Sequence, residues 1–296
     1  MRWQCYHCRH AVNGKNDPSL NIYTTRANVY FKRTEEFSLS GIWRPERRNR
    51  NIGKSWSGYS QSNDMRVPKS WQDKHGNYSA FYERLDGAEE QAATIGKVEL
   101  TVLYAQPRKG FSYGCEPIDV VRLLKSLEGI QPVLPDIIAF RQPTKKQQQQ
   151  NPVWGRFVYF AKLGVHSGSA IILEAQELGT KMRWPKRMSL DERSEYERLI
   201  ADGHVLIEAS RYFEAELVEQ AIRNTKLYRT LLHELGHLAH YQHDVVETQT
   251  ALDHDQDVAQ RLYFAKPSSE REIFAHSYAK KLNKFLRENG SIPFDP

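Results

Sequence analysis

The chain has 296 residues, of which 40% are hydrophobic and 26% are charged, and it carries a net charge of +6. This composition is typical of a folded protein with a buried core and excludes a globally disordered chain. The sequence contains no apolar run near the roughly 20 residues of a membrane-spanning helix. Three cysteines are too few for the disulfide framework of a secreted protein, so we expect a cytoplasmic protein without a membrane segment.

Residues 1–114 differ in composition from the rest of the chain. They contain 18 Lys and Arg against 11 Asp and Glu, whereas residues 115–296 contain 24 against 25. The segments 22–25, 29–32 and 98–105 are rich in β-branched and aromatic residues, which favour strands. We therefore expect a basic, β-leaning N-terminal region over 1–114 and a second domain over 115–296.

Two features of the N-terminal region indicate ligand binding, each with a simpler alternative. The basic segment 44–56 lies between Trp43 and Trp56, so it could bind the phosphates of a nucleic acid while aromatic rings stack on the bases. A solvated loop is the simpler interpretation. Cys5 and Cys8 have the spacing of half a zinc knuckle, but the chain lacks a matching second half. A pair of free thiols is therefore preferred to a metal site.

The second domain is predicted to begin with a helix and several strands. An apolar stripe at helical spacing predicts a helix over 118–127. Strands are expected over 137–140, 156–163 and 169–175, where apolar and β-branched residues are concentrated. The polar tract 142–151 between them has nothing to bury, and we expect a surface loop there.

Helices are predicted to follow the strands. Ser189 and Glu192 have the spacing of a capping box, which indicates the start of a helix. A segment of about 214–244 contains no proline and only one glycine, and it predicts one long helix or two. A last helix is expected over 267–287. Strands followed by helices indicate an α+β fold.

The strongest chemical signal is the segment His233-Glu234-Leu235-Gly236-His237 within the long helix. At 3.6 residues per turn, His233 and His237 project from the same side, so their imidazoles can bind one metal ion. Glu234 is offset by about 100° and can reach a water molecule beside the metal. Because Zn²⁺ lowers the pKa of bound water to about 7 and a carboxylate can accept the proton, the motif predicts zinc-assisted hydrolysis with Glu234 as general base.

A hydrolytic zinc site needs a third protein ligand. The metzincin pattern would place that ligand at His243, but His240 occupies the position where that pattern has a glycine, and no methionine follows the motif. The last helix offers Glu272-Ile-Phe-Ala275-His276-Ser-Tyr-Ala279 instead. Together with the first motif, this segment resembles the gluzincins, and especially their compact IrrE/ImmA-like branch.

The resemblance rests on two short segments and covers at most residues 115–296. It implies a zincin-like metallopeptidase domain, in which a small sheet precedes the active-site helix and a C-terminal ligand helix. It further implies that His233, His237 and Glu272 hold the zinc ion while Glu234 acts as the general base. The resemblance does not extend to the N-terminal region.

Several assignments near the third ligand stay open. Glu270 and His243 are the alternatives to Glu272, which could instead cap the start of its own helix. His276 lies one turn after Glu272 and could donate a hydrogen bond to the oxyanion formed during attack, or it could be a partly buried helix histidine. His240 is interpreted as a structural or supporting residue rather than a ligand.

Two functions remain at this stage. The first is a cytoplasmic zinc endopeptidase acting on a specific intracellular protein, in which the strand 169–175 is the edge of the sheet and an extended substrate adds to it as a further strand. The second is a nucleic-acid-binding protein whose zincin-like domain is structural or inactive. Glu234 favours the first, because a structural metal site needs no general base.

Overall fold

The computed structural model describes residues 70–72, 78–85, 87–130, 132–150, 152–247 and 256–294. All of these residues fall within one compact unit. The expectations for the strands at 22–25 and 29–32, for the basic segment 44–56 and for Cys5 and Cys8 lie outside the described residues.

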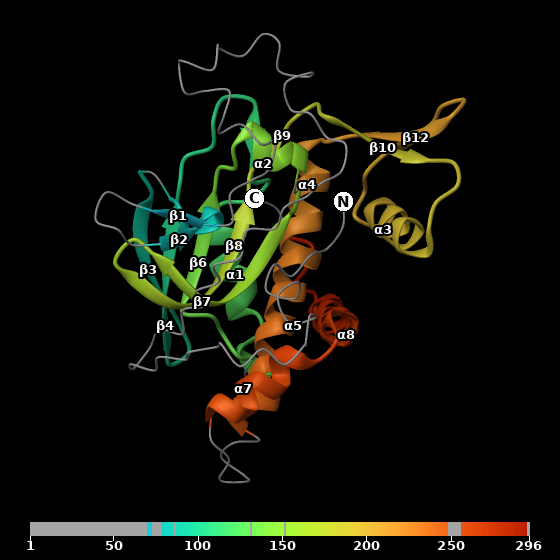
Figure 1. Cartoon of the computed structure of the whole chain (residues 1–296). Helices are drawn as coiled ribbons and strands as arrows, with labels where there is room; N and C mark the ends of the chain where they lie inside the picture. Colours follow the sequence, from blue (N-terminus) through green and yellow to red (C-terminus); the bar gives the residue numbers. More distant parts are fainter. Residues whose placement is uncertain are drawn as a thin grey trace, which may run out of the picture. The chain divides into compact units, whose positions relative to one another are not determined.

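A five-stranded mixed sheet is the centre of the fold (Figure 1). In spatial order its strands are β3 (Glu89–Ile95), β4 (Val98–Tyr104), β6 (Ile137–Arg141), β8 (His166–Glu174) and β7 (Gly155–Leu163). The three inner strands are parallel to one another, and the two edge strands pair antiparallel to their neighbours. The strand expected to be an edge, 169–175, is β8 and is paired on both sides. That expectation is wrong, because an edge position cannot be read from the apolar pattern of one strand.

The sheet crosses the domain boundary that composition suggested at residue 114. β3 and β4 precede this residue, yet β4 pairs in parallel with β6, as in the match of Thr101 with Ile137. Gly114 has φ +71°, and a Cβ there would lie 2.6 Å from the backbone nitrogen of Arg223. The chain at residue 114 is therefore packed tightly against a helix, unlike an exposed linker between domains.

Both faces of the sheet are covered by apolar residues. On one face the sheet packs against α1 (Pro117–Lys125) and the long helix described below, and Leu231 and Leu235 are fully buried there. On the other face Phe81 and Tyr82 of η4 (Phe81–Glu83) pack on the strands. All five residues of β6 are consequently buried, as expected for a central parallel strand.

A continuous helical rod carries the histidine motif. It consists of α4 (Glu219–Thr225), the π-helical η6 (Lys226–Thr230), α5 (Leu231–Tyr241) and the π-helical η7 (Gln242–Glu247). The sequence predicted the helix but began it at 214; these first residues belong to a strand instead, because they pair with two neighbouring strands. The histidine motif in α5 therefore lies between two π-helical turns, η6 and η7.

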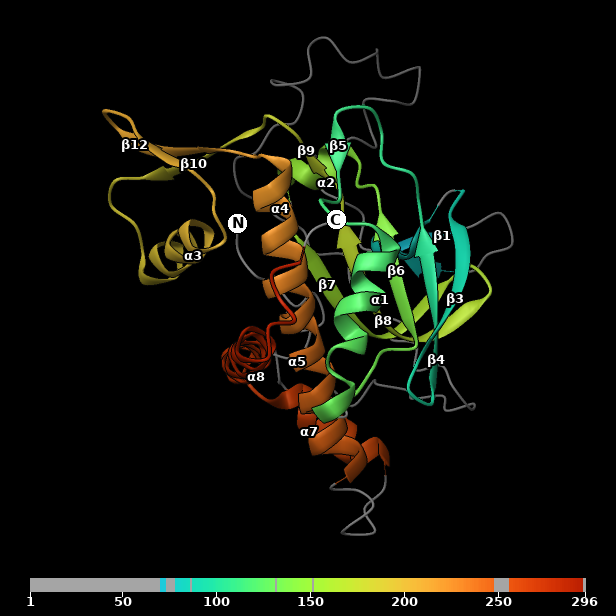
Figure 2. The ribbon, with the colours of Figure 1, turned by 180° about the vertical axis from the view of Figure 1, so that it is seen from behind.

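A small lobe precedes the rod. It contains β10 (Lys181–Pro185), α3 (Leu190–Ala201), β11 (Leu206–Glu208) and β12 (Tyr212–Glu216), with the strands in the order β10-β12-β11. The predicted capping box at its helix is present, because the Ser189 hydroxyl accepts from the backbone N–H of Glu192 and the Glu192 carboxylate accepts from that of Ser189. Both views show α3 on the side of the rod away from the sheet (Figures 1 and 2).

Two helices follow the rod, α7 (Gln256–Ala265) and α8 (Ser268–Glu288). α8 matches the predicted last helix within one residue at each end, and it also lies on the side of the rod away from the sheet (Figure 2). The tract 142–151, predicted to be a loop, contains the short helix α2 (Lys145–Gln150). Its two lysines and four glutamines favour a helix despite having little to bury.

Five short elements complete the described part of the fold. They are β1 (Ser70–Gln72), β2 (Tyr78–Ala80), β5 (Phe111–Ser112), η5 (Glu128–Ile130) and β9 (Gln176–Glu177). The architecture is mixed α and β, in agreement with the predicted α+β class. Among the described residues, no helix is both long and apolar enough to cross a bilayer.

Candidate metal centre

The two histidines of the motif face each other on α5. Their Nε2 atoms lie 3.1 Å apart, and their rings are nearly perpendicular, at 87°. Each side chain is almost completely buried. The helix alone produces this pairing, since residues four apart project from the same side.

Glu272 of α8 brings its carboxylate to the same point. Its Oε2 lies 3.2 Å from Nε2 of His233, and its Oε1 lies 3.6 Å from Nε2 of His237. Oε2 is buried and has no hydrogen-bond donor among the described residues. A buried carboxylate oxygen without a donor is unfavourable, and a cation held by the three side chains would remove that cost.

The spacing of these donor atoms can be compared with that of a zinc site. Two ligands that each lie about 2.0–2.1 Å from a tetrahedral zinc ion are roughly 3.3–3.4 Å apart. The observed separations of 3.1, 3.2 and 3.6 Å bracket this value. Because the two distances from Glu272 end at different carboxylate oxygens, they show that the carboxylate lies beside both imidazoles, at separations close to those between zinc ligands.

The two alternatives for the third ligand lie elsewhere. The side chain of Glu270 is 51% exposed and forms an ion pair with Lys266 at 3.0 Å. His243 is 69% exposed, and its Nδ1 lies 2.8 Å from a carboxylate oxygen of Asp244. Neither side chain belongs to the group of donors around His233.

A glycine makes the approach of α8 to α5 possible. An ideal Cβ at Gly236 would lie 2.7 Å from Cα and 2.8 Å from the carbonyl oxygen of Ala275. Ala275 is itself fully buried. The two helix backbones thus touch between His233 and His237, and this contact places Glu272, one turn earlier on α8, beside both imidazoles.

His276 adds a fourth potential donor. Its ring centroid lies 4.4 Å from that of His233, and His233, Glu272 and His276 offer ligand atoms that all lie within 4.8 Å of one another. This group and the triad with His237 share two members. His237 and His276 are therefore both candidates for the remaining ligand position beside His233 and Glu272.

Burial keeps the imidazoles neutral. It lowers the pKa of His237 to about 3 and lowers the pKa of His233 well below its usual value; neighbouring positive groups add to both effects. The pKa of His276 is also lowered, first by burial and then by the positive charge of Arg198. A neutral imidazole has a free lone pair, and a metal ligand requires that state.

The other motif residues have identifiable environments. Glu234 is 4% exposed and follows His233 directly on α5. His240 is stacked on Phe274, with ring centroids 4.2 Å apart, and its Nε2 lies 3.0 Å from Asp244. These contacts are compatible with the structural or supporting role expected for His240.

An ion-pair network beside the histidines was not anticipated from the sequence. Arg229 of the rod donates from Nη1 to both carboxylate oxygens of Glu195, at 3.1 and 3.0 Å, and from Nε to Asp202 at 2.6 Å. Arg198 also bonds Glu195, through Nε at 3.0 Å. The only available signal was that Arg229 lies four residues before His233, and its partners are about 30 residues away in the sequence.

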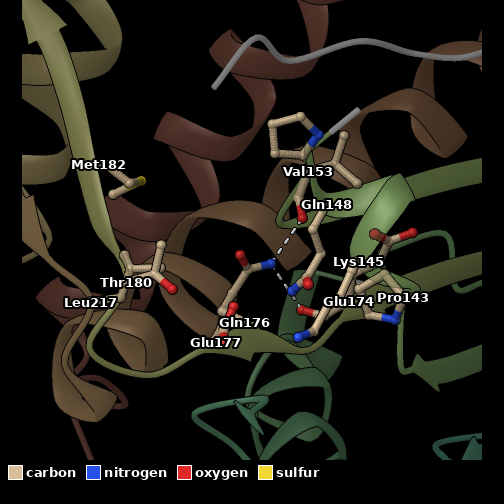
Figure 3. A pocket seen from close by; sticks show the side chains of 11 residues that line it. Pro143, Lys145, Gln148, Val153, Glu174, Gln176, Glu177, Thr180, Met182 and Leu217 are labelled. Atoms are coloured by element: carbon tan, nitrogen blue, oxygen red, sulfur yellow. Dashed lines mark hydrogen bonds between the residues drawn. The ribbon is translucent and has the colours of Figure 1, made fainter. Parts of the chain in front are cut away.

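A pocket of about 330 Å³ lies apart from these residues, past the carboxyl ends of β6 and β8 (Figure 3). On its wall, the Gln176 amide donates to the carbonyl oxygens of Val153 and Glu174 at 2.9 and 3.1 Å. This amide is therefore engaged with the chain itself. None of the donors of the metal centre lines the pocket.

No family model matches this chain, and no curated protein or solved structure matches it. The functional assignment therefore depends on the geometry described above and on the resemblance of the two short segments.

Proposed function

We propose that the protein is a zinc-dependent metallopeptidase of the gluzincin type, with a protein or peptide as its substrate. The observation that carries this proposal is the convergence of His233, His237 and Glu272 at separations of 3.1–3.6 Å. These donors come from two separate helices, α5 and α8, and an imidazole–imidazole–carboxylate set is a zinc-hydrolase donor set.

In this proposal the zinc ion, Glu234 and His276 have separate roles in hydrolysis. A zinc ion bound here supplies Lewis acidity, which lowers the pKa of water to about 7. Glu234 accepts the proton of the attacking water and passes it to the leaving amine. His276, beside His233, donates a hydrogen bond to the carbonyl oxygen as negative charge develops on it.

An extended substrate can be accommodated at the edge of the sheet. Among the described strands, β7 pairs only with β8, so its second edge is free of strand partners. β7 also contacts α5. A peptide that adds to β7 would form backbone hydrogen bonds there and would run past the helix that carries the histidines.

Two other functions are compatible with parts of the sequence. Nucleic-acid binding relies on the segment 44–56, which lies outside the described residues. A purely structural metal site would use His276 as a fourth ligand and would leave no position for water. Glu234 argues against that role, because a metal ion with four protein ligands binds no water molecule for a general base to activate.

The decisive experiment compares Glu234→Gln with the wild-type protein. Both are expected to bind one zinc ion per chain, measured by elemental analysis, while only the wild type cleaves peptides in a mixture analysed by mass spectrometry. The loss should be about 100-fold or more, because general base catalysis contributes 10²–10⁴-fold. Unchanged cleavage in Glu234→Gln would exclude the proposed mechanism, and absence of zinc in the wild type would exclude the proposed site.

A further inference from the structure

The pocket past the carboxyl ends of β6 and β8 has the composition of a site for a small organic molecule (Figure 3). Its volume of about 330 Å³ lies at the lower end of the range of about 300–1,000 Å³ for such sites. Sites of this kind combine apolar walls with a few polar groups at fixed positions. The apolar lining residues here are Pro143, Pro152, Val153, Met182 and Leu217.

Gln176 supplies a polar group whose orientation is fixed. The residue is 6% exposed, and its Nε2 uses both hydrogens, on the carbonyl oxygens of Val153 at 2.9 Å and Glu174 at 3.1 Å. These two bonds distinguish the amide nitrogen from the amide oxygen and hold the group in one orientation. No described residue donates a hydrogen bond to Oε1 of Gln176. Figure 3 draws this amide between Gln148 and Thr180, so its oxygen is an acceptor on the pocket wall.

Glu174 adds a second buried acceptor to the same wall. The residue is 2% exposed, and its Oε1 accepts from Arg141 at 2.9 Å and from Arg156 at 2.6 Å. Within the described part of the chain, no group donates to its Oε2. Two arginines beside one carboxylate give this cluster a surplus of positive charge, which disfavours a cationic ligand. The buried end of the pocket therefore offers hydrogen-bond acceptors without attracting a cation.

These acceptors and the apolar wall select the ligand together. A buried acceptor without a donor is unfavourable, and an N–H group of a ligand removes that cost. A water molecule can also donate to the oxygen, but only an apolar body gains free energy from covering Val153, Met182 and Leu217. A molecule that combines an N–H group with an apolar body uses both parts of the pocket.

Two further side chains can bind additional polar groups of the ligand. Gln148 is half-buried, Thr180 is exposed, and both line the pocket. Neither the Gln148 amide nor the Thr180 hydroxyl forms a hydrogen bond with another residue that the structure describes. Each can donate and accept, so these two residues do not restrict the ligand as strongly as the buried acceptors do.

We propose that this pocket binds a small neutral molecule with an apolar body and an amide-type N–H group, which donates a hydrogen bond to Oε1 of Gln176. The site is distinct from the metal centre, because none of the metal donors lines the pocket. The inference is therefore independent of the proposed metallopeptidase function, and it can be tested without zinc and without turnover.

Three small aromatic probes test the inference on the full chain. Benzamide has the N–H group, N,N-dimethylbenzamide lacks it, and benzylamine carries a positive charge instead. Their affinities are measured by ligand-observed NMR titration of the wild type, Gln176→Met, Thr180→Phe and Gln91→Met. Gln176→Met removes the acceptor at similar length, and Thr180→Phe enlarges an exposed side chain of the lining. Gln91 is an exposed glutamine of β3 outside the pocket, so Gln91→Met is the matched control.

We expect the wild type and Gln91→Met to bind benzamide with a millimolar dissociation constant, as is usual for so small a molecule. N,N-dimethylbenzamide should bind about 10-fold more weakly, because it leaves the buried acceptor unpaired. Benzylamine should bind no more tightly than benzamide. Gln176→Met should bind the two amides equally, and Thr180→Phe should weaken both because the larger side chain fills part of the pocket.

Several results would overturn the inference. They are equal affinities of the two amides in the wild type, a preference for benzamide that persists in Gln176→Met, and absence of benzamide binding at about 10 mM. Tighter binding of benzylamine would contradict a neutral ligand and would indicate a cation site at Glu174. Should Gln176→Met fail to melt cooperatively, Thr180→Phe decides, since an unchanged affinity for benzamide there would place the bound probe outside this pocket.

Discussion

Replacement of Gly236 by alanine should weaken zinc binding much more than it weakens the fold. The added Cβ would lie 2.7 Å from Cα of Ala275. Ordinary contact begins at 3.4 Å, so α5 and α8 must separate by the difference, 0.7 Å. Metal–ligand distances tolerate only about 0.2 Å of variation. The histidines on α5 and Glu272 on α8 would therefore no longer fit one ion.

The effect of Gly236→Ala on folding should be small because two contributions oppose each other. Overpacking of a close contact costs about 1–3 kcal/mol, whereas alanine in a helix interior is favoured over glycine by roughly 1 kcal/mol. We therefore expect a loss of stability of about 0–2 kcal/mol. Zinc affinity should fall by about 10- to 100-fold, the scale observed when residues that orient metal ligands are changed.

The assay combines chemical unfolding of the metal-free protein with competition for zinc against a chromophoric chelator. Gly129→Ala is the matched control, because a Cβ there meets nothing within 4 Å and the backbone does not need a positive φ. It should change neither property by much. If Gly236→Ala bound zinc as tightly as the wild type, the close contact would not be what positions Glu272, and the reasoning would be refuted.

Three further predictions follow from other contacts. Glu272→Ala should abolish stoichiometric zinc binding in elemental analysis, whereas Glu270→Ala should retain the metal, since that side chain pairs with Lys266; the reverse result would remove Glu272 from the site. Burial lowers the pKa of Lys226 to about 7, and an unfolded lysine keeps its proton to about pH 10.4. Above pH 7 the unfolded state thus binds more protons than the folded state. The free energy of unfolding should therefore increase by up to about 1.4 kcal/mol per pH unit, until the cysteines of the unfolded chain begin to lose their protons near pH 8.5. In Lys226→Met, the free energy of unfolding, measured by denaturant titration at several pH values, should depend less on pH. An unchanged dependence on pH would contradict the assignment of this effect to Lys226. A fragment of residues 70–296 should fold, as judged by circular dichroism and cooperative melting, whereas 115–296 should not, because it lacks β3 and β4; a cooperative transition in the shorter fragment would show that these strands are dispensable.

Local signals predicted the parts of the site that depend on one helix. The pairing of His233 with His237 follows from helical periodicity alone, and the capping box at Ser189 likewise needs only four residues. The last helix was predicted because a proline precedes it and a glycine follows it. In each case, one short stretch of sequence contains all the interacting groups.

Contacts between distant segments were harder to predict. The pairing of β4 with β6 joins segments on either side of residue 114. The change in charge content at this residue suggested a domain boundary, although the sheet continues across it. The link from Arg229 to Glu195 spans 34 residues, and each of the two residues alone resembles an ordinary surface charge. Charged residues lie mostly at the surface, so a change in charge content along the chain does not reveal which strands share a sheet.

The π-helical turn η6 gives the rod one residue more than a regular α-helix of the same length would contain. The backbone N–H of Leu231 donates to the carbonyl oxygen of Lys226, five residues earlier. A regular α-helix forms this hydrogen bond between residues four apart. The segment therefore contains one residue more than such a helix requires, in the manner of an insertion absorbed by a bulge. Deleting one residue between Lys226 and Leu231 should convert the π-helical turn into an α-helical turn without changing the side of the helix from which His233 projects. We therefore expect the helix to tolerate a change in length at this position.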